Sequence, residues 1–195
     1  MPALIGSDAK LKKDEIKRYF NFCYERYERL FDIVKGPKAY YQKADPLRHP
    51  IIFYYGHTAC FYVNKLKLFK AIDEGINPKM KSMFAVGVDE MSWDDLNEEH
   101  YDWPSIEETK EYRAKVKELV NSIIDKSELS LPIEQDSIWW VILMGIEHEN
   151  IHLETSSVLI RQLPLEFVQE IEDFKEIVEY KKPPKNELLD VPSGY

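Results

Sequence analysis

Cysteine is scarce in this sequence, which contains only two, Cys23 and Cys60, among 195 residues. Two cysteines cannot form the disulfide framework that stabilises small secreted domains, and their scarcity fits a reducing compartment. Both fall within apolar helical patterns, so we expect small buried side chains rather than reactive thiols. Stability is therefore expected to come from an apolar core, which a chain of this length can form as one domain.

Long apolar runs and positive net charge are missing as well. The longest apolar run, residues 138–146, is far too short to cross a bilayer, and the first residues lack the apolar centre of a signal peptide. The 26 lysines and arginines are outnumbered by 35 acidic residues. We therefore expect a cytoplasmic protein whose partners include neither nucleic acid nor a membrane.

Strand patterns are also absent, since no segment alternates polar and apolar residues between turn signals. Apolar residues instead recur at three- and four-residue steps in four long segments. These predicted helices run from about Ser7 to Val34, from Pro50 to about Glu74, from Pro104–Ser105 through Ile123, and from Ser137 to Gln162. The pattern predicts an all-α protein, an antiparallel four-helix bundle at residues 1–171. A long loop is expected at about 76–103, and a linker or extended tail at 172–195.

Two of the five histidines, His148 and His152, lie four residues apart on the last predicted helix. At that spacing their rings project from one face, and the residues that share the face indicate that the pair points into the bundle. Two such imidazoles can bind one transition-metal ion. The alternative is a pair of core histidines that other side chains satisfy by hydrogen bonds.

A third ligand is expected from a different helix, and His57 is the best placed because aromatic residues flank it one turn away on either side. His49 precedes a helix start and is expected in a turn or on the surface, while His100 is expected to be exposed. The sequence therefore predicts a metal site of His57, His148 and His152. The residues assign neither a catalytic group nor an organic cofactor.

Residues 148–152 also match H-E-x-x-H, the helix of zinc peptidases in which the glutamate is the general base. That chemistry needs a further ligand downstream and a strand that holds the substrate, and no sheet is predicted. Glu147 and Glu149 are rotated off the histidine face, so three histidines are a more economical ligand set than two with a carboxylate. Nitrogen ligands alone do not decide between iron and zinc. A zinc hydrolase and a metal-binding module without chemistry remain the alternatives.

Three long runs carry a resemblance to a known family: DPLRHPIIFYYGHTACFYVNKL at 45–66, MFAVGVDEMSWDDLN at 83–97 and WWVILMGIEHENIHLETSSVLIRQLP at 139–164. Over most of residues 45–164 the sequence resembles the amino-terminal DinB-like domain of the 5-histidylcysteine sulfoxide synthases of ovothiol biosynthesis. It is more distantly similar to their ergothioneine-pathway relatives. The resemblance implies Fe(II) at His57, His148 and His152, with L-cysteine, L-histidine and O2 as substrates.

Members of that family continue into a second domain similar to formylglycine-generating enzymes, and commonly into a methyltransferase domain. The resemblance implies that the second domain supplies much of the substrate pocket and a catalytic tyrosine, neither of which this sequence contains. A separate or missing catalytic domain is therefore an expected partner, and the chain alone is expected to be incomplete as an enzyme. We expect a metal site with one side open. Tyr54, Tyr55 and the 83–95 loop either line that side or pack against another domain.

Overall fold

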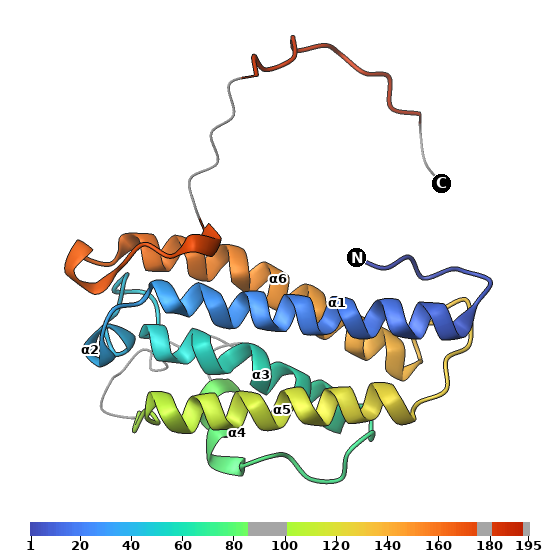
Figure 1. Ribbon diagram of the computed structural model, residues 1–195, viewed down its shortest axis with the longest axis horizontal. Coiled ribbons are helices and arrows are strands. Elements are labelled where there is room, and N and C mark those ends of the chain that lie inside the picture. Colours follow the sequence, from blue (N-terminus) through green and yellow to red (C-terminus); the bar gives the residue numbers. More distant parts are fainter. Residues whose placement is uncertain (86–100, 175–180, 193–195) are drawn as a thin grey trace.

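The computed structural model describes residues 1–85, 101–174 and 181–192, which form a helical bundle and an exposed tail (Figure 1). The four long helices are α1 (Ala9–Leu30), α3 (Ile51–Leu68), α5 (Ile106–Lys126) and α6 (Ile138–Gln162). The shorter elements are α2 (Pro37–Tyr40), α4 (Pro78–Ala85) and the 3₁₀ turns η1 (Phe31–Ile33), η4 (Leu165–Phe167) and η5 (Glu172–Phe174). Over the described ranges no strand forms beyond a single bridge between Val34 and Val168. The all-α prediction is confirmed.

Helices α1 and α6 run in one direction, and α3 and α5 run in the other (Figure 1). Both α1 and α3 pack against α5 and α6, so each long helix has one parallel and one antiparallel neighbour. Because α3 and α5 are parallel, the chain between them must return along the length of the bundle, which explains why that connection is long. The predicted bundle is confirmed, but its predicted antiparallel arrangement is only partly met, because each long helix also has a parallel neighbour.

The first helix is shorter than predicted at both ends. Asp8, not Ser7, is the N-cap, since its carboxylate accepts a hydrogen bond from the backbone N–H of Leu11 at 2.9 Å. The helix ends at Leu30 and continues as one 3₁₀ turn, so the predicted end at Val34 was too late. Neighbouring polar residues before a helix compete for the capping position, and the sequence pattern does not decide between them.

The second long helix ends at Leu68, well before the predicted Glu74. Lys70 takes a left-handed conformation with φ of 61°, and the N–H of Ala71 donates to the carbonyl of Leu66 at 2.9 Å. This is the bonding pattern of a Schellman end, in which glycine is the usual left-handed residue. The prediction missed the helix end because a lysine occupies that position.

The last two long helices begin where the sequence predicts. Ser105 and Glu108 form a capping box at the start of α5, and the hydroxyl of Ser137 accepts from the N–H of Trp140 at the start of α6. The predicted loop at 76–103 is partly wrong, because its first part is helix α4 with a proline in the first turn. Residues 86–100 lie outside the described part of the chain.

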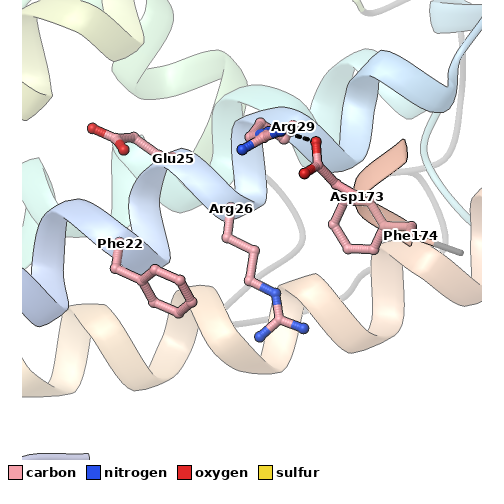
Figure 2. A pocket seen from close by; sticks show the side chains of 6 residues that line it. All are labelled: Phe22, Glu25, Arg26, Arg29, Asp173 and Phe174. Atoms are coloured by element: carbon pink, nitrogen blue, oxygen red, sulfur yellow. Dashed lines mark hydrogen bonds and ion pairs between the residues drawn. The ribbon is translucent and has the colours of Figure 1, made fainter. Parts of the chain in front are cut away.

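After α6 the chain turns back along α1. Backbone hydrogen bonds join residues 33–35 to residues 167–169, and η5 then packs against α1. Figure 2 shows Asp173 paired with Arg29 and Phe174 beside it, around a pocket of about 320 Å³. The proposed boundary at 171/172 stays a prediction, although residues 172–174 contact the bundle. No helix in the described ranges is long and apolar enough to span a membrane.

Candidate metal centre

The three predicted histidines come together where α3 and α6 pack against each other. His57 lies in the middle of α3, and His148 and His152 lie one turn apart on α6. The ring centroid of His57 is 5.1 Å from that of His148 and 4.6 Å from that of His152, and the two α6 rings are 4.5 Å apart. The two antiparallel helices thus bring all three imidazoles to one place.

The spacing of the ring nitrogens suits a single metal ion. One nitrogen from each of the three rings lies within 4.8 Å of the others. Two nitrogens bonded to the same ion at about 2.1 Å are at most about 4.2 Å apart, so small ring rotations are enough to reach a common ion. We call His57, His148 and His152 the histidine cluster. The structure brings these predicted ligands together, while metal binding itself stays a prediction.

His57 is oriented by the backbone of α4. Its side chain is 3% exposed, and its Nδ1 donates a hydrogen bond to the carbonyl oxygen of Phe84 at 2.8 Å. Because Nδ1 carries the proton in this bond, Nε2 is the nitrogen with a lone pair for a metal. A metal-bound histidine commonly donates its other N–H in this way. Gly56 allows α3 and α4 to approach this closely, since a Cβ at residue 56 would lie 2.3 Å from the Phe84 ring.

His148 and His152 are partly buried, and the Nδ1 atom of each is buried without a hydrogen-bond partner in the described residues. Burial and the neighbouring imidazoles lower the pKa of His148 to about 2 and that of His152 to about 3. Both rings are therefore neutral near pH 7, which is the form that binds a metal. Buried polar atoms that lack a partner are rare and need an explanation. A bound metal ion supplies one, so the residues present fit the predicted group.

Aromatic rings hold the cluster from both sides. The ring of Phe61 stacks on His148 with centroids 3.7 Å apart and an interplanar angle of 6°, and Phe53 stacks on His57 at 5.1 Å. Tyr54 lies beside His152 with ring centroids 6.4 Å apart. These contacts limit the rotation of the imidazoles and so keep their nitrogens directed at one region.

Glu149, the glutamate of the H-E-x-x-H match, points away from the histidine cluster into the core. It is 1% exposed, and its Oε1 accepts from the guanidinium of Arg113 at 3.0 Å and from the hydroxyl of Thr58 at 3.2 Å. Tyr62 donates to its Oε2 at 3.3 Å. We call Arg113, Glu149 and Thr58 the Arg113 network. A general base must reach the bound substrate, and a carboxylate bonded to three core residues does not meet that requirement.

Sequence reasoning missed Arg113, although one signal for it exists. Position 113 belongs to the buried stripe of α5, together with Thr109, Val116, Val120 and Ile124. An arginine on an apolar stripe indicates a buried cation, which requires a buried partner. That partner is 36 residues away in the sequence, on a helix that does not follow from local pattern.

Other expectations have mixed outcomes. His49 was expected in a turn or on the surface. It lies in the connection before α3, but a surface position is wrong, because it is 7% exposed, with its ring 4.4 Å from Phe53 and 5.7 Å from Trp103 by centroids. Tyr55 does not line the cluster, because its ring packs in the core at 4.6 Å from that of Phe31. The prediction for His100 and most of the 83–95 loop falls outside the described residues.

The two cysteines are buried, as predicted. Cys60 lies one turn from His57, but its thiol donates to the carbonyl of Lys81 at 3.2 Å. Burial raises the pKa of this thiol to about 12, so it is protonated near pH 7 and a poor metal ligand. Among the residues that the structure describes, the cluster that suits a metal consists of the three histidines alone.

Comparison with protein families agrees with this architecture. The family model of the DinB superfamily matches residues 19–156, which is more than half of the chain. The chain belongs to the DinB superfamily. The matched range contains all three histidines of the cluster and the whole Arg113 network. No curated protein matches the chain, and neither a substrate nor a reaction follows from the family match.

Proposed function

We propose that this chain is the iron-holding domain of a non-haem Fe(II), O2-dependent sulfoxide synthase that joins the sulfur of L-cysteine to the ring of L-histidine. The observation that carries the proposal is the pair of buried Nδ1 atoms without partners, on His148 and His152, beside a third histidine already oriented by a backbone carbonyl. The resemblance of residues 45–66, 83–97 and 139–164 to that enzyme family supplies the choice of metal and substrates.

The chain's own residues would hold the iron and keep its surroundings defined. His57, His148 and His152 would be the ligands, and three neutral imidazoles leave coordination positions for exogenous molecules. When bound, ferrous iron would supply the redox chemistry that a reaction with O2 requires. Phe61 and Phe53 fix the rings and exclude water from one side of each. The proposed reaction needs groups beyond these, and we propose that a further catalytic domain supplies them, as the resemblance implies.

The first test is iron analysis of anaerobically purified protein. We expect stoichiometric iron in the wild type and loss of iron in the His148→Ala and His152→Ala variants. Cys60→Ala is the matched control, because it removes a buried side chain one turn from His57 that the structure does not include in the cluster. Full iron occupancy in both histidine variants would refute the site.

The second test concerns the substrate and does not require a complete enzyme. Co²⁺-loaded protein should gain a sulfur-to-metal charge-transfer band when L-cysteine is added, and no such band with L-serine, which differs in that single atom. If Co²⁺ binds normally but L-cysteine produces no band, the metal centre would stand and direct binding of the thiol by this chain would be refuted.

A second candidate is a metal-binding module without chemistry of its own. One observation favours it: Phe61 and Phe53 stack on His148 and His57, and such apolar rings position imidazoles without binding the charged groups of an amino acid. Oxygen uptake with L-cysteine and L-histidine separates the two candidates. Sulfoxide formation by the isolated chain would reject the module.

A zinc hydrolase is the least supported alternative, because Glu149 is bonded to Arg113 and not directed at the histidine cluster. If a peptidase activity were detected, a Glu149→Gln variant that retained it would exclude the H-E-x-x-H mechanism, in which the glutamate is the base.

A further inference from the structure

Arg113 connects all four long helices of the bundle at the level of the histidine cluster. It projects from α5 and is 0% exposed. Its Nε donates to the carboxylate of Glu28 on α1 at 3.1 Å, one Nη donates to the carbonyl of Tyr55 on α3 at 2.9 Å, and the other donates to Glu149 on α6 at 3.0 Å. A single side chain thus ties its own helix to the other three.

The bonding of the guanidinium group is nearly complete. A further bond runs to the hydroxyl of Thr58 at 2.8 Å, and the rings of Tyr24, Tyr27 and Tyr55 lie within 4.3 to 5.4 Å of the guanidinium carbon. Hydrogen bonds to a charged group depend steeply on distance and angle, and a buried network in which every member is bonded is rigid. Apolar contacts alone would let the same helices slide or rotate more freely.

The Arg113 network and the histidine cluster use the same turns of the same two helices. Thr58 directly follows His57 on α3, and Glu149 directly follows His148 on α6. Consecutive residues of an α-helix project about 100° apart. On each of the two turns, the histidine and the network residue therefore project from different sides of the helix. The Thr58 hydroxyl also donates to Glu149 at 3.2 Å, which joins α3 to α6 directly.

We propose that the Arg113 network is a positioning device for the metal centre: it fixes the rotation and the sliding of α3 against α6. It thereby sets how closely the nitrogen of His57 faces those of His148 and His152. A side-chain tip lies about 6 Å from its helix axis, so a rotation of about 10° moves it about 1 Å. Metal–ligand distances tolerate only about 0.2 Å. This inference rests on the proposed function in one respect, that the histidine cluster binds a metal.

The test is a Co²⁺ titration followed by the d–d absorption of the bound ion, with circular dichroism to establish that each variant is folded. Glu149→Gln keeps the shape of the side chain and removes its charge. We expect its Kd for Co²⁺ to rise 10- to 100-fold, the usual effect of losing a residue that orients metal ligands, and the d–d bands to shift. Thr58→Val, which removes only a hydroxyl, should raise the Kd less.

Val120→Ala is the matched control for general loss of stability. It removes buried volume from α5 two turns beyond Arg113 and belongs to neither the network nor the cluster. We expect a lower unfolding temperature with the wild-type Kd and the wild-type d–d spectrum.

Three results would contradict the inference. Wild-type Kd values and spectra in folded Glu149→Gln and Thr58→Val would mean that the network serves stability alone, and so would a rise in Kd for Val120→Ala as large as that for Glu149→Gln. If Glu149→Gln does not fold, Thr58→Val decides. A wild-type protein that binds no Co²⁺ would instead refute the metal centre, and this inference with it.

Discussion

The histidine cluster and the Arg113 network lie back to back on α3 and α6, yet their polar atoms are in opposite situations. In the network, the carboxylate of Glu149 accepts hydrogen bonds from three side chains, and the charge of Arg113 is neutralised within the core. In the cluster, two buried nitrogens have no partner in the described residues. Buried groups that are fully bonded indicate a structural role, whereas buried groups left unbonded indicate that something else binds there.

The comparison predicts that the two regions respond in opposite ways to loss of a polar side chain. Replacement of His148 or His152 by an apolar ring should abolish metal binding and leave the apoprotein at least as stable. Removal of a network residue should lower stability strongly and change metal binding through geometry.

The largest effect on metal binding is expected for His148→Phe. The new ring retains the stack on Phe61 and removes a buried nitrogen without a partner, so the free energy of unfolding of the apoprotein should stay equal or rise. Iron binding should fall below detection in anaerobic equilibrium dialysis. A clear loss of stability in this variant would mean that the histidine is bonded in the core and that the comparison is wrong.

The largest effect on stability is expected for Arg113→Met, which leaves Glu149 buried without its cation. Removal of one member of a buried ion pair costs about 3–5 kcal/mol. Urea unfolding followed by circular dichroism measures this loss. The double variant Arg113→Met with Glu149→Leu should recover much of it, because no buried charge is then unpaired; if it does not, the charge of Glu149 is not the source of the cost.

A smaller effect is expected for Gly145→Ala, which tests the packing between the two regions. The added Cβ would lie 2.2 Å from the ring of Tyr62, a donor to Glu149. Overpacking of this kind costs about 1–3 kcal/mol in unfolding free energy. Gly6→Ala is the matched control, since the nearest atom to its new Cβ is 3.4 Å away, and thermal unfolding should hardly change. Equal losses in the two variants would contradict the close packing at residue 145.

The smallest effect is expected for Ser105→Ala, which removes the capping box of α5 and changes no residue of either region. The loss of an N-cap costs about 0.5–2 kcal/mol, measurable as a lower midpoint of urea unfolding. The Kd for Co²⁺ should stay at the wild-type value. A weaker metal affinity here would show that any destabilisation of the bundle reaches the cluster, which would remove the special role of the network.

The sequence predicted the parts of this fold that depend on local pattern. The helix starts at Ser105 and Ser137, the four apolar stripes and the His148–His152 pair all follow from residues a few positions apart. His57 was chosen because it lies on an apolar helix face, and the structure brings it to the pair. Helix α4 was missed, although Pro78 in its first turn was a usable signal.

What the sequence did not indicate depends on contacts between distant segments. His49 is buried because Tyr101 and Trp103, more than fifty residues later, pack against it. The partner of Arg113 is equally remote, so the glutamate of H-E-x-x-H was recognised as off the histidine face but not as part of an ion pair. Family membership settles the fold and leaves the reaction as a proposal.

X-ray absorption spectroscopy of the anaerobically iron-loaded protein tests the central claim most directly. Three imidazole ligands with Fe–N distances of about 2.0–2.2 Å and no sulfur ligand are the predicted result, by analogy with other protein metal–imidazole bonds. Fewer than three imidazoles, or a sulfur atom from Cys60 at about 2.3 Å, would contradict the assignment of the metal to His57, His148 and His152.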